Sequence, residues 1–91
     1  MSARRLRIRG RVQGVGYRDW LLGTARAHGL AGWVRNRLDG SVEALLSGDE
    51  DAVREVVNAC RRGPPLARVD ELDESFADPP DGPGFLRQPT A

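Results

Sequence analysis

The chain has 91 residues, of which 40% are hydrophobic and 30% charged, and its formal net charge is +1 at pH 7. This length supports one hydrophobic core, so we expect residues 1–91 to form a single domain. The near-neutral charge creates no overall field toward nucleic acid or membrane, so we expect neither as a partner. The sequence contains no membrane-spanning apolar run and no signal peptide, which predicts a cytoplasmic protein.

The basic residues, the cysteine and the histidine exclude several classes of protein. Every one of the 14 basic residues is arginine, so the chain lacks the lysine of a Walker-type nucleotide site or a Schiff-base enzyme. Cys60 is the only cysteine and His28 the only histidine, so we expect no disulfide framework, no metal site and no cofactor. No exposed apolar stripe demands a partner chain, which favours a monomer.

The first part of the chain alternates like a strand and then changes to helical spacing. Alternating apolar residues and arginines predict a strand over residues 5–12 with one wet face. After a glycine-broken loop, helical spacing up to Gly29 predicts a helix over residues 18–28. One side of the strand carries Leu6, Ile8 and Val12, and the residues that recur at helical spacing are Tyr17, Leu21, Ala25 and His28.

The middle of the chain predicts a hairpin and then a second helix. Strand-like runs over residues 30–37 and 41–47 flank Asp39-Gly40, the strongest short hairpin signal. The second helix begins after Asp49, a good N-cap, and ends near Gly63, which we predict to be its C-cap. Its apolar stripe consists of Val53, Val56, Val57 and Cys60.

The end of the chain completes a recognisable order of elements. Residues 67–76 are expected to form a strand, and residues 85–87 a short edge strand. The order β-α-β-β-α-β predicts an α+β, ferredoxin-like split βαβ fold, with an antiparallel sheet and two helices on one face. Because this fold hosts many functions, the function has to be argued from a site.

The loop Gln13–Arg18 has the features of a phosphate-binding turn. Gly14 and Gly16 allow successive backbone N–H groups to point inward at the positive end of the following helix. Arg18 carries a planar guanidinium that can donate two parallel hydrogen bonds to phosphate oxygens. A plain strand-to-helix turn with a solvated Arg18 explains the same spacing, so the loop by itself leaves both interpretations open.

Asn36 is a second candidate for the same site. Strand alternation places it on the side of Val34, at the end of the second predicted strand. In the split βαβ order the first and second strands flank the third, so Asn36 can reach the neighbourhood of the loop. An asparagine before a hairpin is also ordinary turn chemistry, which remains the alternative.

Two segments together resemble the signatures of the acylphosphatase family. Gly10–Arg18 is similar to the phosphate-loop signature of these enzymes, and Gly29–Asn36 with Asp39–Glu43 is similar to the second signature. Gly63–Pro65 also fits the family, and the resemblance covers essentially the whole chain. Tyr17 stands where the family more often has phenylalanine; an aromatic ring is kept, so we expect no loss.

The resemblance implies hydrolysis of an acyl phosphate to a carboxylate and inorganic phosphate, the expected small-molecule partners. It assigns the catalytic roles to Arg18 and Asn36. Phosphate binding is implied for the loop residues Gln13, Gly14, Val15, Gly16, Tyr17 and Arg18. The chemistry is consistent with these residues, because a carboxylate of pKa roughly 4 to 5 departs without a general acid or a metal. Asn36 would place the water, while Arg18 and the loop amides would stabilise the transferred phosphoryl group.

Other phosphatase chemistries lack their residues. A cysteine phosphatase needs arginine six positions after Cys60, where Leu66 stands, and a histidine phosphatase needs arginine before His28, where Ala27 stands. The acidic run Asp49-Glu50-Asp51 favours helix capping over magnesium binding. We expect His28 to be structural and Cys60 to lie in the core.

Two further functions compete with hydrolysis. Ferredoxin-like sheets can bind RNA on their open face, where Arg5, Arg7, Arg9 and Arg11 would lie, but this row supplies no stacking aromatics. Salt-dependent binding of single-stranded RNA at low micromolar affinity would support that alternative. The second competitor is a carbamoyl-phosphate-handling domain like that of hydrogenase-maturation proteins. Those domains precede zinc-binding and catalytic regions that this sequence lacks, so we expect a free-standing hydrolase.

Overall fold

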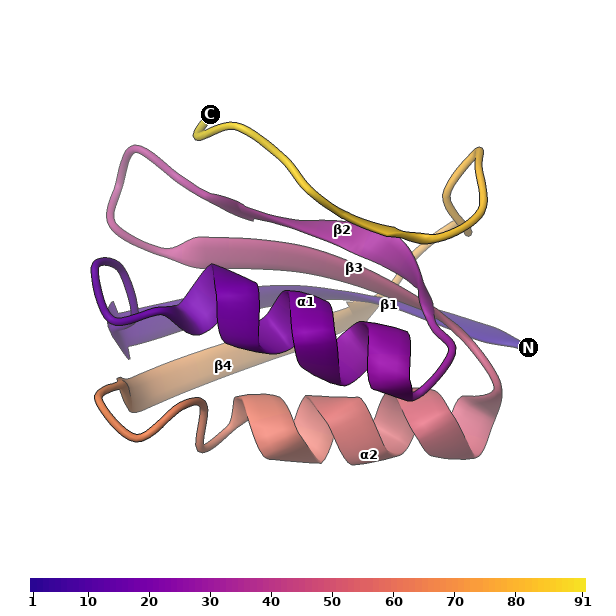
Figure 1. Ribbon diagram of the computed structural model, residues 1–91, viewed down its shortest axis with the longest axis horizontal. Helices are drawn as coiled ribbons and strands as arrows, with labels where there is room; N and C mark the ends of the chain where they lie inside the picture. Colours follow the sequence, from indigo (N-terminus) through magenta and orange to yellow (C-terminus); the bar gives the residue numbers. More distant parts are fainter.

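The computed structural model describes residues 1–91, which form a twisted sheet with both helices packed on one face (Figure 1). Neither helix is long and apolar enough to cross a membrane. The elements in chain order are β1 (Ser2–Arg11), α1 (Tyr17–Ala27), β2 (Ala31–Asn36), β3 (Val42–Gly48), α2 (Glu50–Cys60), β4 (Arg68–Phe76) and β5 (Phe85–Arg87). The predicted β-α-β-β-α-β order and the ferredoxin-like fold are therefore confirmed.

The sheet has the strand order β4-β1-β3-β2-β5. As predicted, β1 and β2 both flank β3, and all three pairings among β1, β2, β3 and β4 are antiparallel. The predicted antiparallel arrangement therefore holds for the four strands β1–β4, while β5, expected only as a short edge strand, pairs with β2 in parallel. The reason is the path of residues 77–84, which carry the chain from β4 at one edge to the opposite edge, where it turns back beside β2 (Figure 1).

The predicted boundaries differ from the observed ones mostly by one residue. The largest difference is in β1, which begins at Ser2 because its pairing with β3 continues as far as Gly48. Helix α2 begins after Asp49 as predicted, and the Asp49 carboxylate accepts a hydrogen bond from the Ala52 amide at 3.1 Å. The C-cap of α2 is Arg61 rather than Gly63.

The core lies between the sheet and the helices, as the alternating pattern predicts. The buried apolar side chains that alternate along β1, β2 and β3 point toward the two helices, whereas Arg5, Arg7, Arg9 and Arg35 point to the open face. Phe85 closes the core at the edge formed by β5, with 1% of its surface exposed. The other residues of this cluster are Leu6, Ile8, Val12, Tyr17, Leu21, Ala25, Leu30, Val34, Val42, Ala44, Leu46, Val53, Val56, Val57 and Cys60.

The open face of the sheet is organised around one buried carboxylate, that of Glu43. Its side chain is fully buried and accepts hydrogen bonds from Arg5 Nε at 2.6 Å and Arg35 Nε at 2.8 Å. The guanidinium groups of Arg7 and Arg37 lie 3.8 and 3.4 Å from the same carboxylate. In the sheet register Glu43 stands opposite Arg7 of β1 and Arg35 of β2, so the central strand places it between both rows.

Acidic residues of β4 also pair with Arg9 on this face. Arg9 contacts Asp73 and Glu71 at 2.7 and 3.4 Å. An aromatic residue does lie on this side, because Trp33 of β2 faces away from the helices with the Arg35 guanidinium 4.8 Å from its ring centre. Arg5, Arg7 and Arg9 of the arginine row are thus paired with acids, as the interpretation of a balanced face predicts, whereas Arg11 has no acidic partner.

We expect Glu43→Gln to lower the free energy of unfolding by about 3 kcal/mol, because the surrounding arginines lose a buried counter-charge. Burial raises the pKa of Glu43, but hydrogen bonds from Arg5 and Arg35 outweigh it and hold the pKa below 4.5. A carboxyl whose pKa is lowered by folding stabilises the protein above its unfolded pKa, and this stabilisation is lost as the pH falls through the folded pKa. Urea denaturation of wild type and variant between pH 7 and pH 3 measures the difference.

The matched control is Glu71→Gln, which removes an exposed carboxylate paired with Arg9 on the same face. We expect this change to cost less than about 1 kcal/mol, since both partners are solvated. Equal losses in the two variants, or a difference between Glu43→Gln and wild type that is independent of pH, would contradict the role of the buried carboxylate.

Candidate active site

The loop between β1 and α1 turns on two glycines in the left-handed region. Gly14 has φ 73° and Gly16 has φ 80°, a conformation that strains any residue with a Cβ. Gly16 is the N-cap of α1 and provides no side chain to cap it. The first N–H groups of the helix therefore remain available to hydrogen-bond an anion, and the positive end of the helix dipole lies at the same place.

Two side chains fasten this loop to the rest of the fold. Gln13 Nε2 donates hydrogen bonds to the backbone oxygens of Arg37 and Ser41, at 2.8 and 2.9 Å. At the other end, the Tyr17 hydroxyl donates to the backbone oxygen of Cys60 at 2.6 Å. The loop is thus tied to the β2–β3 hairpin on one side and to the end of α2 on the other, which restricts its conformation before any ligand binds.

The structure gives a physical account of Tyr17, the departure from the more usual phenylalanine. The side chain is buried, and burial raises its pKa far above the ordinary value, so the hydroxyl stays a neutral donor. It satisfies a carbonyl at the C-terminal end of α2, where helix carbonyls lack intrahelical partners. Gly63 packs on the ring, since a Cβ at this position would lie 2.6 Å from Tyr17 Cε2.

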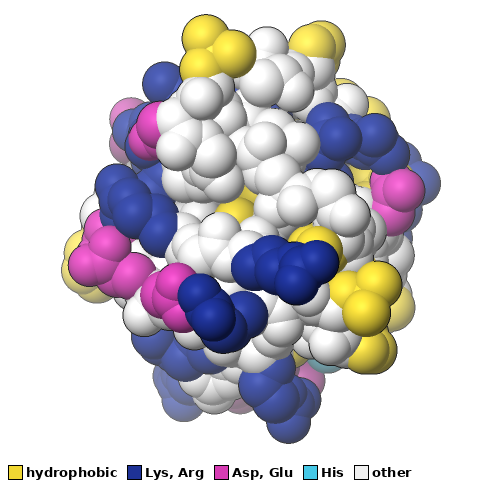
Figure 2. Space-filling model, turned by 90° about the vertical axis from the view of Figure 1, so that its left-hand side faces the viewer, with side chains coloured by type: hydrophobic (Ala, Val, Ile, Leu, Met, Phe, Trp, Pro, Cys, Tyr) yellow, Lys and Arg dark blue, Asp and Glu magenta, His cyan; other side chains and the backbone are white.

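A small pocket of about 160 Å³ brings the loop and β2 together. Gly14, Gly16 and Arg18 from the loop and first helical turn line it, as does Asn36 from the end of β2. Gln13 and Val15 do not line this pocket, because Gln13 is turned toward the hairpin and Val15 packs against the core cluster. The remaining lining residues are Val12, Tyr17, Asp19 and Arg87. Figure 2 shows this end of the molecule, where arginine side chains surround a mostly uncharged centre.

Asn36 is buried in the wall of this pocket and has an unused hydrogen-bonding atom. Its side chain is on the same face as Val34, as predicted, and 8% of the residue is exposed. The oxygen Asn36 Oδ1 is buried and accepts no hydrogen bond from the protein. Since a buried carbonyl without a partner is costly, this atom is suited to accept a hydrogen bond from a water or ligand in the pocket.

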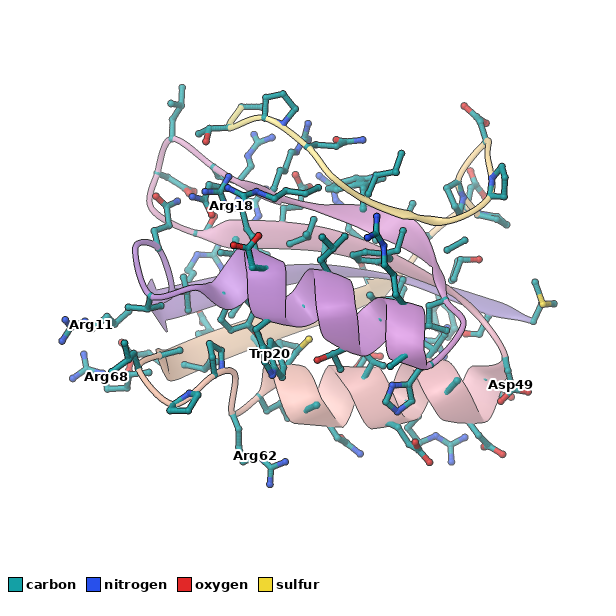
Figure 3. All side chains as sticks on the ribbon, in the orientation of Figure 1. Arg11, Arg18, Trp20, Asp49, Arg62 and Arg68 are labelled. Carbon is teal, nitrogen blue, oxygen red and sulfur yellow. The ribbon has the colours of Figure 1, made fainter.

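Arg18 differs from most arginines of this protein in having no acidic partner. It is half-buried in the first turn of α1, and no carboxylate lies within ion-pair distance of its guanidinium. Figure 3 shows its side chain rising from α1 toward β2, whereas Arg11, Arg62 and Arg68 lie lower, beside the loop and the end of α2. A half-buried, uncompensated guanidinium in a pocket is a strong site for an anion.

Sequence reasoning missed two charged residues of the pocket, Asp19 and Arg87. Arg87 Nη1 and Asp19 Oδ1 form an ion pair beside Arg18. Asp19 follows Arg18 directly, so its position next to the candidate arginine was a usable signal. Arg87 offered no such signal, because only the parallel placement of β5 beside β2 brings it to the pocket.

The other candidate residues have structural contacts outside this pocket. His28 Nε2 lies 3.2 Å from Glu55 of α2, and its Nδ1 lies 2.9 Å from the Thr24 oxygen, so it links the two helices. Cys60 is fully buried, and burial raises the pKa of its thiol to about 12. Asp49 caps α2. The structural interpretations of these residues agree with their contacts.

The acylphosphatase family model matches residues 4–86 of this chain. An acylphosphatase from Acidiphilium cryptum is 58% identical over 90 residues, which cover 99% of each chain. Another from Rhodospirillum rubrum is 56% identical over 85 residues, covering 93% of each. The crystal structure of acylphosphatase from Bacillus subtilis has a TM-score of 0.91 at 37% identity, covering 97% of this chain and 99% of that one. The chain therefore belongs to the acylphosphatase family.

Proposed function

We propose that this chain hydrolyses acyl phosphates to a carboxylate and inorganic phosphate, with Arg18 and Asn36 as its catalytic residues. The observation that carries the proposal is a single pocket lined by Gly14, Gly16, Arg18 and Asn36. It joins donors for a phosphate to a buried oxygen with no partner in the protein. Membership of the acylphosphatase family supports the same reaction.

In the proposed reaction, the loop and Arg18 bind the phosphoryl group. The uncapped N–H groups at the start of α1 and the Arg18 guanidinium are donors from two directions, suited to the equatorial oxygens. Charge on these oxygens is redistributed in the transition state, where preorganised donors act most strongly. The attachment of the loop through Gln13 and Tyr17 supports such preorganisation.

Asn36 is proposed to orient the attacking water. Its buried oxygen can accept a hydrogen bond from the water and hold it in line with phosphorus. The water oxygen then forms a bond to phosphorus while the bond between phosphorus and the acyl oxygen breaks. The products are a carboxylate and dihydrogen phosphate, since the phosphate oxygens take the proton of the water.

This reaction needs neither a general acid nor a metal ion. The leaving carboxylate has a pKa of about 4 to 5 and departs as an anion. The one carboxylate that lines the pocket, Asp19, is paired with Arg87, which disfavours its use as a metal ligand.

We further propose that the chain acts as a cytoplasmic monomer without nucleic-acid or membrane partners. The pairing of Arg5 and Arg9 with acids supports the absence of a nucleic-acid partner, and sedimentation of the purified chain tests its monomeric state.

The proposed function is tested by assaying the purified chain on benzoyl phosphate in the presence of excess EDTA. We expect hydrolysis at the same rate with and without the chelator, because guanidinium and amide donors carry out the charge stabilisation. The absorbance change of benzoyl phosphate on cleavage gives the rate. Absence of hydrolysis would reject the function, and strong inhibition by EDTA would reject the metal-free mechanism.

A further inference from the structure

The pocket contains a second guanidinium, that of Arg87, which the proposed reaction leaves without a role. Arg87 is the last residue of β5 and stands in parallel register with Val34 of β2. Its side chain is 42% exposed and lines the same pocket as Arg18 and Asn36. Two arginines from opposite ends of the sequence therefore border one small cavity.

The backbone around Arg87 is held firmly against β2 and α1. The Gln88 amide donates to the Val34 oxygen at 2.9 Å, and the Ala91 amide donates to the Asn36 oxygen at 3.1 Å. Arg26 of α1 donates two hydrogen bonds to the Phe85 oxygen, at 3.1 and 2.9 Å. These backbone hydrogen bonds fix the position of Arg87 at the pocket, and its side chain lies at the pocket rim.

The Asp19 carboxylate contacts the Arg87 guanidinium through only one of its nitrogens and offsets its charge. Arg87 Nη1 contacts Asp19 Oδ1, while Nε and Nη2 of the same group have no partner in the protein. A guanidinium offers five N–H donors, so this pairing leaves donors free for a phosphate oxygen. With Arg18 and Arg87 positive and Asp19 negative, the pocket lining has one net positive charge, fewer than the roughly two negative charges of a phosphoryl group.

We propose that Arg87 is a second phosphate-binding residue of this pocket, and that Asp19 positions it and limits the affinity for phosphate. The inference rests on the proposed function, because it adds residues to the same phosphate site. Arg87 donates to the phosphoryl oxygens from the side of β5, opposite the loop. The Asp19 carboxylate, close to the same group, repels the phosphate product and favours its release.

The two residues therefore have effects of opposite sign on phosphate affinity. We expect Arg87→Gln to raise the dissociation constant of inorganic phosphate about tenfold at low salt, and Arg87→Lys to raise it less. Asp19→Asn keeps a hydrogen-bond acceptor for Arg87 but removes the charge, so we expect it to lower the constant several-fold. Isothermal titration calorimetry with inorganic phosphate measures all three values, and both shifts should shrink as the ionic strength rises.

Arg62→Gln is the matched control, since Arg62 is an exposed arginine on the same end of the molecule that does not line the pocket (Figure 3). We expect its phosphate affinity to equal that of wild type. If Arg87→Gln behaves like this control, or if Asp19→Asn binds phosphate no more tightly than wild type, the inference is overturned. Should Arg87→Gln fail to fold, Arg87→Lys and Asp19→Asn still decide it.

Parallel assays on benzoyl phosphate separate this inference from the proposed function. If wild type hydrolyses the substrate but the variants bind phosphate with unchanged affinity, only the roles of Arg87 and Asp19 are rejected. If the variants shift the phosphate dissociation constant as expected but wild type does not hydrolyse benzoyl phosphate, only the proposed function is rejected. A purely structural ion pair between two exposed side chains would change the unfolding midpoint slightly and leave phosphate affinity unaltered.

Discussion

Replacing Arg18 with alanine should abolish measurable hydrolysis of benzoyl phosphate. We expect kcat/KM to fall by about 10³-fold or more, since a guanidinium that stabilises transferring phosphoryl oxygens contributes on this scale. The dissociation constant of inorganic phosphate should rise at least about tenfold, because the same group contacts the ground-state anion. Steady-state assays and phosphate titration measure the two effects on the same preparation.

The reason for expecting so large an effect is the isolation of Arg18 from acids. Its guanidinium forms no ion pair in the protein, so its full charge is directed at the ligand. Arg11→Ala is the matched control, because Arg11 is exposed beside the loop, has no acidic partner and does not line the pocket. We expect this control to retain activity within about threefold, as distant exposed charges act weakly through water. Similar losses in both variants would reject a specific role for Arg18.

Replacing Asn36 with alanine should reduce kcat by about 10²-fold while leaving the phosphate dissociation constant within about twofold of wild type. The separation follows from the proposed task of Asn36, which is to place water and not to bind the phosphoryl group. A fall in phosphate affinity as large as that of Arg18→Ala would contradict this division of roles. Kinetics on benzoyl phosphate and inhibition by inorganic phosphate distinguish the two outcomes.

The stability of Asn36→Ala provides an independent check. The side chain of Asn36 forms no hydrogen bond with the protein, and its buried oxygen has no partner. Alanine therefore removes an unsatisfied polar atom from a nearly buried position, so we expect the free energy of unfolding to stay equal or to increase. An inactive variant that is as stable as wild type would show that Asn36 is retained for the reaction. Substantial destabilisation would instead assign it a structural task.

The conformation of the proposed phosphate loop depends on its own glycines and on contacts with residues that are distant in the sequence. Gln13 and Tyr17 hold the loop from two sides, and their partners Ser41 and Cys60 lie far from them in the sequence. Gln13 was predicted to bind phosphate, but its side chain is committed to the hairpin, so only its backbone remains for that role. The glycines supply the turn, while these distant contacts hold it in place.

Much of this protein was predictable from the sequence alone, because local sterics set the relevant patterns. Alternation in β1 identified its buried side, the left-handed turns required glycine at Gly14 and Gly16, and alternation in β2 put Asn36 on the side of Val34. The order of elements then brought β1 and β2 to the two sides of β3. These features depend on residues close together in the chain, or on the few topologies that a β-α-β-β-α-β order permits.

Only the tertiary structure decided which distant side chains meet. Glu43 becomes the buried partner of the arginines because β3 is the central strand, flanked by Arg7 and Arg35. Arg87 reaches the pocket because residues 77–84 carry the chain to the far edge of the sheet, where β5 runs parallel to β2. Which edge of the sheet β5 joins depends on how the whole core packs around Phe85. A strand of three residues is too short to carry a periodic pattern that would predict this edge.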